Sequence, residues 1–174
     1  MSDEYTDETA AGQVTAAPGS PLASLRDRRS KARNDLFLDL PVPRYDPPIF
    51  VRFKPLEQTK IAAGQKEIDV RKKDRDVLLR VNAGFIATAC LGVFEVVDGE
   101  KVSVDPDTRS TDPEDWPKFG PELAALLGEE DTDRAVEVVQ ALYLTDGDIL
   151  ATAAEIAAWS GYSGEQLDQD FEGN

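Results

Sequence analysis

The run from Ile49 to Lys54 alternates apolar and polar residues. Ile49, Val51 and Phe53 fall on one face of this run, which is the pattern of a half-buried strand. Residues 34–40 show a similar period of two and are followed by prolines that forbid a helix. We therefore expect an extended segment there and a strand at 49–54.

A second strand signal surrounds Asp98-Gly99. The apolar runs 93–97 and 101–104 flank this pair, and Asp-Gly supplies the positive φ angles that a tight hairpin turn requires. Because two strands alone are marginally stable, we expect the hairpin to pair with the strand at 49–54 or to lie against a helix.

Five other segments are predicted to be helical. A short helix is predicted over 56–66, interrupted or ended near Gly64. A central core helix is predicted over 76–91, in which Gly84 would admit a close neighbour. Three further helices, joined by acidic breaks, are predicted over residues 121–127, 133–144 and 148–159.

These elements predict an α+β protein that is mainly α with a small β element: a helical C-terminal region, one β-hairpin plus an extended strand, and disordered tails at both ends. The tails, residues 1–21 and 161–174, are acidic and too polar to offset the entropy cost of ordering. Between them we expect a basic arm at 22–34, which could form a short helix, and one compact domain at 35–160. That domain has two parts, the strand, hairpin and core helix at 35–105 and the acidic helices at 113–160.

Charge is segregated along the 174 residues, whose formal net charge is −15. Residues 112–174 hold 16 acidic and 2 basic residues, whereas residues 26–80 hold 15 basic and 9 acidic residues. This asymmetry points to protein partners, and the net charge argues against nucleic acid held by phosphate contacts. Basic front and acidic back could pair between copies, as a homo-oligomer, or within one molecule, and both interpretations stay open.

The chain also shows no apolar run near the roughly 18 residues of a membrane span, and no apolar segment with positive flanks at its start. We therefore expect a soluble, intracellular protein without a membrane contact.

Residue types for chemistry are sparse, and we predict no enzyme, no metal site and no cofactor. The sequence contains no histidine, which removes His-based nucleophile activation, His general bases and the commonest zinc ligand sets. Residues 146–148 fit a turn and helix cap, because a calcium loop would need acids where Leu142 and Leu144 stand. The single cysteine, Cys90, lies in an apolar run and is expected to be a small buried hydrophobe.

Aromatic residues near acidic and polar segments are the remaining candidates for binding a partner: Trp116, Phe119, Trp159, Tyr162 and Phe171. The two tryptophans could equally cap the core. In the last predicted helix, only Thr152 and Glu155 interrupt an apolar surface. The predicted partner-binding residues are Leu150, Ala154, Trp159, Tyr162 and Phe171.

The order in which these segments follow one another is itself informative. The chain passes from a proline-rich stretch at 38–43 and Tyr45-Asp46 to the strand at 49–53, a helix ending at 89–92, the hairpin around Asp98-Gly99, and a hydrophobic acidic end at 157–160. Over roughly residues 35–160, this order resembles the tail assembly chaperones of long-tailed bacteriophages that infect actinobacteria.

The resemblance implies a protein of the host bacterial cytoplasm that binds the long, helical, aggregation-prone tape measure protein, keeps it soluble and helps the tail tube assemble. It implies absence from the mature virion and, in many such genes, a longer frameshifted product. The expected partners are therefore the tape measure protein, the tail tube protein and that longer form. Accessible apolar helices and strong like charge suit this task, so we expect 121–171 to face the client and 35–105 to form the packed unit.

Two other classes of protein remain as alternatives. A virion structural protein, such as a head-tail joining or tail tube subunit, would stay in the particle and usually carries more β-structure. An acidic regulatory protein, such as a DNA mimic, would carry carboxylates over much of its surface, which the basic front half opposes.

Overall fold

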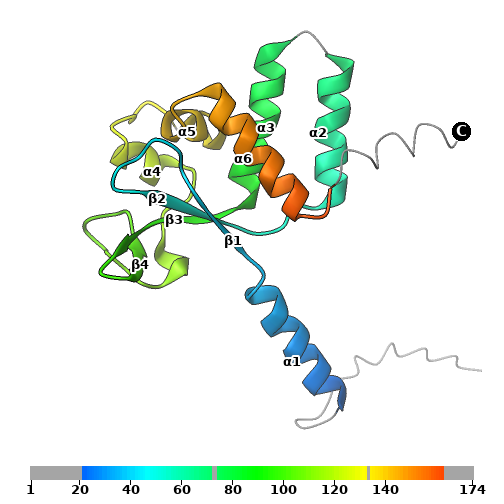
Figure 1. The fold of residues 1–174 in the computed structure, drawn as a ribbon, viewed down its shortest axis with the longest axis vertical. Coiled ribbons are helices and arrows are strands. Elements are labelled where there is room, and N and C mark those ends of the chain that lie inside the picture. Colours follow the sequence, from blue (N-terminus) through cyan, green and yellow to red (C-terminus); the bar gives the residue numbers. More distant parts are fainter. Residues whose placement is uncertain (1–20, 72–73, 133, 163–174) are drawn as a thin grey trace, which may run out of the picture. The chain divides into compact units, whose positions relative to one another are not determined.

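The computed structural model describes residues 21–71, 74–132 and 134–162. The predicted disordered tails lie outside these residues, except at Pro21, Gly161 and Tyr162. The described helices and strands, drawn in Figure 1, confirm the α+β class. In chain order they are α1 (Pro21–Asn34), β1 (Leu38–Pro41), β2 (Ile49–Phe53), α2 (Gln58–Val70), α3 (Arg75–Ala89), β3 (Cys90–Val97), β4 (Glu100–Ser103), the short 3-10 helix η1 (Pro113–Asp115), α4 (Pro121–Leu126), α5 (Ala135–Leu142) and α6 (Asp146–Trp159).

The chain divides into two compact units, residues 1–35 and residues 36–174. In the first unit α1 is the described element, and all of its described side chains are exposed. The segment predicted as a basic arm is therefore helical, and it starts at Pro21, because the fixed φ angle of proline suits the first helical position. The other described elements belong to the second unit.

The sheet has four antiparallel strands in the order β1-β2-β3-β4. Strands β3 and β4 form the predicted hairpin, in which Asp98 and Gly99 have φ angles of 51° and 83°, and β3 pairs with β2 as expected. The segment predicted as extended is a strand only from Leu38 onward, since Asn34 still belongs to α1. Pro41 is tolerated in β1 because an edge strand has one side without a partner strand.

The core helix α3 ends two residues earlier than predicted, and β3 follows it without a loop. Asp74 caps the start of α3 by accepting hydrogen bonds from the backbone N–H groups of Asp76 and Val77. At the other end Cys90 has an extended backbone and pairs with Phe53 of β2. The apolar run that predicted a longer helix therefore spans a helix end and a buried strand.

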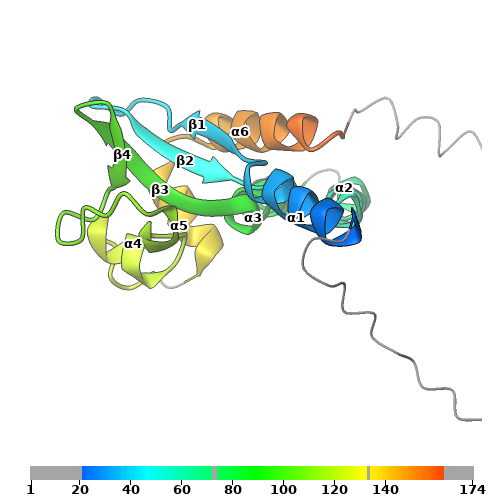
Figure 2. The same cartoon turned by 90° about the horizontal axis from the view of Figure 1, so that it is seen from below.

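Helix α2 runs through Gly64 to Val70, so the predicted interruption at Gly64 is wrong. A Cβ atom at Gly64 would lie 2.5 Å from Cζ of Phe85 and 2.8 Å from Cγ1 of Val81, both on α3. The close neighbour predicted at Gly84 is also wrong, because a Cβ there would meet nothing within 4 Å outside its own helix backbone. Figure 1 shows α2 and α3 side by side, and Figure 2 shows the same fold from below.

One hydrophobic core joins the sheet to α3, α5 and α6. Its fully buried side chains come from both parts of the second unit, for example Phe53 from β2 and Ile156 from α6. The packed unit is therefore not confined to residues 35–105, as expected, because residues of 121–156 also belong to the core. The expectation that 121–171 faces a client stays a prediction. A binding surface on the C-terminal helices has to be the outer side of elements whose inner side is core.

The face of the sheet that points away from these helices carries an aromatic stack. Phe94 of β3 lies 5.4 Å from Phe50 and 4.5 Å from Trp116, measured between ring centroids. Trp116 follows η1, is 3% exposed and donates a hydrogen bond from Nε1 to the backbone oxygen of Ser110. Trp116 and the buried Phe119 are thus core residues, and they are not available to a partner.

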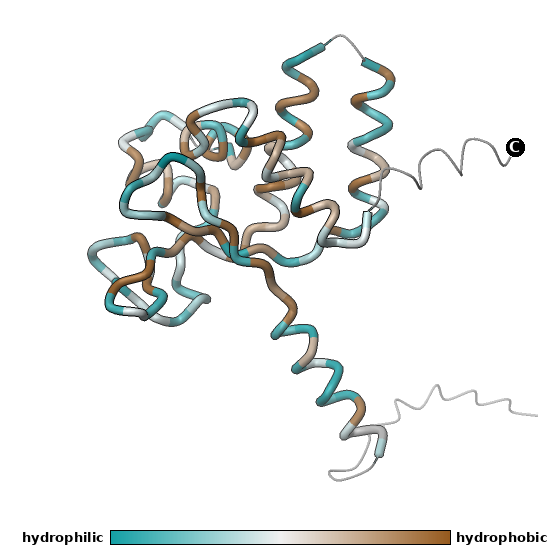
Figure 3. The backbone as a smooth tube through the Cα atoms, viewed as in Figure 1, coloured by the Kyte–Doolittle hydropathy of each residue, from teal (hydrophilic) through white to brown (hydrophobic). Residues whose placement is uncertain are grey.

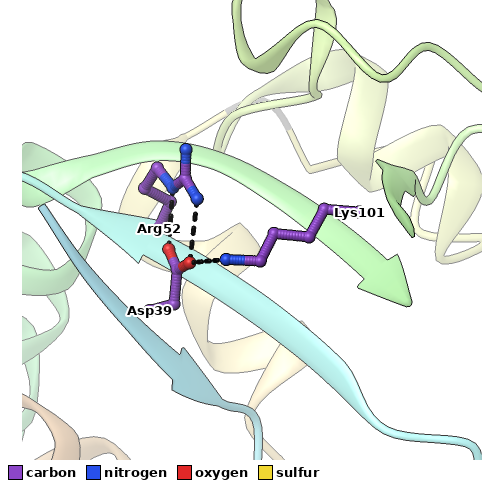
Figure 4. A network of polar contacts seen from close by, with 3 residues as sticks. All are labelled: Asp39, Arg52 and Lys101. Carbon is purple, nitrogen blue, oxygen red and sulfur yellow. Dashed lines mark hydrogen bonds and ion pairs between the residues drawn. The ribbon is translucent and has the colours of Figure 1, made fainter. Parts of the chain in front are cut away.

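A network of three charged side chains lies beside this stack (Figure 4). Arg52 of β2 donates two hydrogen bonds to Asp39 of β1, and Lys101 of β4 donates a third to the same carboxylate at 2.7 Å. Charge-assisted bonds of this kind are stronger than neutral ones. The network therefore connects three of the four strands on a face that the aromatic residues partly shield from water.

Candidate partner-binding face

Helix α6 has well-defined ends. Thr145 caps its start by accepting a hydrogen bond from the backbone N–H of Asp148, and Asp146 and Asp148 place negative charge beside the positive end of the helix dipole. The helix ends at Trp159, and Gly161 follows with a φ angle of 91°. The segment 145–148, predicted to supply a turn and a helix cap, thus supplies the cap at Thr145, and the helix starts at Asp146, two residues earlier than predicted.

The inner face of α6 is core. Ile149, Thr152, Ala153 and Ile156 are buried at spacings of three and four residues, against α3 and α5. Thr152, which was expected to interrupt the apolar surface of this helix, is only 6% exposed and belongs to the inner face.

The outer face of α6 is apolar as well. Gly147, Ala151, Ala154 and Ala158 recur at spacings of three and four residues and are exposed, on the side opposite the buried residues. Leu144, just before the helix, is 59% exposed, and Leu150 is half-buried beside the alanines. We call these six residues the α6 outer face. A helix that is apolar all round is usually covered all round, so this face has the character of a contact surface.

Two ion pairs fix the start of α6 beside this face. Arg44 Nε lies 2.7 Å from Asp148 Oδ2, and Arg75 Nη2 lies 2.8 Å from Asp146 Oδ2. The hydrogen bond between Arg44 and Asp148 raises the pKa of Arg44 and lowers the pKa of Asp148. Both pairs reach solvent, so each adds little stability, but they neutralise two carboxylates next to the outer face and leave Glu155 exposed on its border.

The structure brings only part of the predicted partner-binding set together. Ala154 is exposed on the α6 outer face and Leu150 is half-buried beside it. Trp159 is half-buried on the flank of α6. Tyr162 packs against the core and its hydroxyl is shielded from water. Phe171 lies outside the described residues.

Sequence reasoning missed four members of the outer face: Leu144, Gly147, Ala151 and Ala158. The available signal was the spacing of small residues at 147, 151, 154 and 158, which places them on one side of a helix. Because the helix is apolar on both sides, this spacing alone does not show which side faces the core and which faces outward.

Two buried side chains have shifted pKa values. Burial raises the pKa of the Cys90 thiol to about 11, and burial also raises the pKa of Tyr143. Among the described residues, no group of three or more His, Cys, Asp or Glu side chains is arranged to hold a metal ion. Across the same residues, every helix is too short or too polar to cross a membrane.

Comparisons with protein-family models, with curated proteins and with solved structures find no match to this chain. A proposal of function therefore depends on the α6 outer face and on the resemblance in the order of segments.

Proposed function

We propose that this protein is a tail assembly chaperone of a long-tailed bacteriophage, which binds apolar helical segments of the tape measure protein through the α6 outer face. The observation that carries the proposal is this uncovered apolar side of a helix whose other side is core. The order of segments along the chain suggests the identity of the client. In this role the protein acts in the host cytoplasm by binding rather than by catalysis, promotes tail tube assembly and leaves before the virion is complete.

The small residues of the α6 outer face suit a helical client. Glycine and alanine let two helix axes approach to about 8 Å, and they lose little or no side-chain entropy when covered. Leu144 and Leu150 add most of the apolar area, at about 1.5–3 kcal/mol for each leucine that becomes fully buried. One such contact is weak and reversible, which a chaperone that must release its client requires.

The charge of the chain supports the same role. A net charge of −15 opposes aggregation of a complex that carries an apolar client. The two carboxylates nearest the helix start are paired with arginines, so the outer face itself is not strongly charged. An apolar helix can therefore approach this face while the remaining acidic surface keeps the complex in solution.

Co-expression with the tape measure protein encoded in the same phage genome tests the proposal. The wild-type chain is expected to keep the tape measure protein soluble and to copurify with it. Ala154→Glu places a charge at the centre of the outer face and should abolish copurification. Ala62→Glu, at an exposed alanine of α2, introduces the same residue away from this face and should leave copurification intact.

A second arm of the experiment separates the chaperone from a virion structural protein. Purified virions are examined by mass spectrometry for peptides of this chain, which should be absent. An insoluble tape measure protein, both with this chain and with its longer frameshifted form, would contradict the proposal. Stoichiometric peptides in the virion would favour a head-tail joining or tail tube subunit.

A further inference from the structure

Helix α1 is strongly basic and uncovered. Its 14 residues include Arg26, Arg28, Arg29, Lys31 and Arg33 but only one acid, Asp27, and every described side chain is exposed. Figure 3 shows it as mostly hydrophilic. An isolated helix of 14 residues is marginal in water, so covering one face of α1 would stabilise it.

One side of α1 concentrates the charge. Arg26, Arg29 and Arg33 are spaced by three and four residues and share a face of the helix. Leu25 is 65% exposed and stands four residues before Arg29. We call these four residues the α1 docking face, which combines one apolar contact with three positive charges.

The second unit carries a complementary group between α4 and α5. Glu129, Glu130 and Asp131, here called the acidic loop, are all exposed, and Leu126 at the end of α4 is 41% exposed. Among the described residues, these three carboxylates take part in no side-chain hydrogen bond or ion pair. The acidic loop thus offers three negative charges beside one exposed leucine.

Three other acidic residues of the second unit accept hydrogen bonds within it. Asp105 accepts a hydrogen bond from the backbone N–H of Asp107, Asp112 accepts one from Glu114, and Asp115 accepts one from the hydroxyl of Ser110. The acidic loop differs from these three residues in offering three adjacent carboxylates to a row of arginines.

We propose that the α1 docking face of one copy binds the acidic loop and Leu126 of a second copy, so that copies associate front to back. The match is one leucine and three like charges on each side. Residues 21–34 carry a net charge of +4 (five basic, one acidic), whereas residues 121–132 carry −4 (four acidic, none basic). Such a contact is heterologous, since two different surfaces meet, and a pair of copies joined by it keeps one free acidic loop on one copy and one free docking face on the other.

A polyanion such as nucleic acid is the weaker occupant of α1. The chain outside residues 21–34 carries −19 (−15 minus +4), and this charge repels a phosphate backbone. Self-association goes beyond the proposed function, since it needs no client. It would nevertheless strengthen weak client contacts, because linked copies bind one long client with a high effective concentration.

Sedimentation velocity of the full chain at low and high salt tests this inference. The wild type should associate at low salt and dissociate as salt screens the charges. Two triple variants reverse the charge of one side each, Arg26→Glu with Arg29→Glu and Arg33→Glu, or Glu129→Lys with Glu130→Lys and Asp131→Lys. Each variant alone should associate at least about tenfold more weakly than the wild type.

Mixing the two triple variants is the decisive step, because each variant has like charges on both of its own surfaces but opposite charges to those of the other variant. The unchanged α1 of the loop variant then meets the unchanged acidic loop of the arginine variant, and the two reversed surfaces can pair as well. The mixture should form a complex with the affinity of the wild type. A control variant, Lys54→Glu with Lys60→Glu and Lys66→Glu, changes the net charge by as much as the arginine variant does, at exposed lysines, and should associate like the wild type. Circular dichroism spectra and unfolding temperatures verify that all variants are folded.

Three results would overturn the inference. They are a wild type that is monomeric at all concentrations, an oligomer that tolerates both triple variants, and a mixture that does not associate. Binding of a short duplex DNA through α1, more tightly than self-association and lost in the arginine variant, would assign the helix to nucleic acid instead.

Discussion

The guanidinium of Arg52 and the carboxylate of Asp39 face each other across β1 and β2, joined by hydrogen bonds of 2.7 Å from Nε and 2.9 Å from Nη2. Their side chains are only 11% and 17% exposed. The guanidinium also lies 3.7 Å from the ring centroid of Phe37 and 5.0 Å from that of Trp116. The planar group is thus held by a forked hydrogen bond and by aromatic rings, and it fastens the four-residue edge strand to the sheet.

Replacing Arg52 by lysine tests whether this geometry matters beyond its charge. Arg52→Lys keeps the positive charge but loses the fork and the stacking, so the free energy of unfolding should fall by about 1–2 kcal/mol. Urea denaturation measures the change. Arg80→Lys, at an exposed ion pair with Glu67, is the control and should change stability by less than about 0.5 kcal/mol. Equal losses of stability in the two variants would mean that Arg52 stabilises the fold through its positive charge alone.

The acid limb of the stability curve should depend on Asp39. Burial alone would raise the pKa of this carboxyl, but hydrogen bonds from Arg52 and Lys101 outweigh burial and hold it below the ordinary 3.8. Because the pKa is lower in the folded protein, the pair stabilises the fold fully above the unfolded pKa. That contribution is lost as the pH falls through the folded pKa.

Asp39→Asn should therefore lower the free energy of unfolding by about 2–3 kcal/mol near pH 7, and the difference from the wild type should shrink near pH 2. Urea denaturation across this range checks the prediction. Glu100→Gln removes an exposed carboxylate of β4 and should change the curve little. A deficit for Asp39→Asn that is constant with pH would show that the carboxylate charge is not the stabilising element.

Local patterns predicted most elements of this fold. The alternation from Ile49 to Phe53, the Asp-Gly turn and the helical periodicities are properties of neighbouring residues, and each yielded an observed strand, turn or helix. The boundary at Cys90 was not predictable in this way, because a short apolar run suits a buried helix and a buried strand equally. The helix ends before Cys90 because Cys90 pairs with Phe53 of β2, 37 residues away in the chain.

The candidate site was predictable only in part for a related reason. Leu150 and Ala154 were identified because α6 is rich in apolar residues. For Trp116, which stands in a polar, acidic stretch, the sequence left open whether it binds a partner or caps the core. Its burial results from stacking on Phe94, a contact between distant segments that no local pattern contains. Arg52 was placed on a solvent side by alternation, yet the aromatic residues on that face shield it.

Cys90 offers a direct probe of the core, since it is the only cysteine. Burial raises its pKa from 9.0 to about 11, which reduces the thiolate fraction by about two orders of magnitude at neutral pH. Iodoacetamide should therefore label the native protein at least about 100-fold more slowly than the urea-unfolded chain. Mass spectrometry follows the reaction, and rapid complete labelling without urea would contradict the buried position.

A pair of glycine substitutions separates helix propensity from tertiary packing. Gly84→Ala in α3 adds a methyl group that meets nothing within 4 Å, so it should stabilise the protein by about 0.5–1 kcal/mol. Gly64→Ala in α2 gains the same propensity. However, its Cβ would lie 2.5 Å from the Phe85 ring and 2.8 Å from Val81, whose side chain is buried.

Overpacking of this kind costs about 1–3 kcal/mol, so Gly64→Ala should be destabilising by about 1 kcal/mol in net terms. Urea denaturation of both variants gives the two signs directly. The double variant Gly64→Ala with Phe85→Leu tests whether a more flexible side chain relieves the contact. A triple variant with Phe85→Ala and Val81→Ala would be less informative, because it also removes buried core area. If Gly64→Ala stabilised the chain as much as Gly84→Ala, the close approach of α2 to α3 would not require a glycine at this position. Gly64 would then neither interrupt the helix nor be needed for packing.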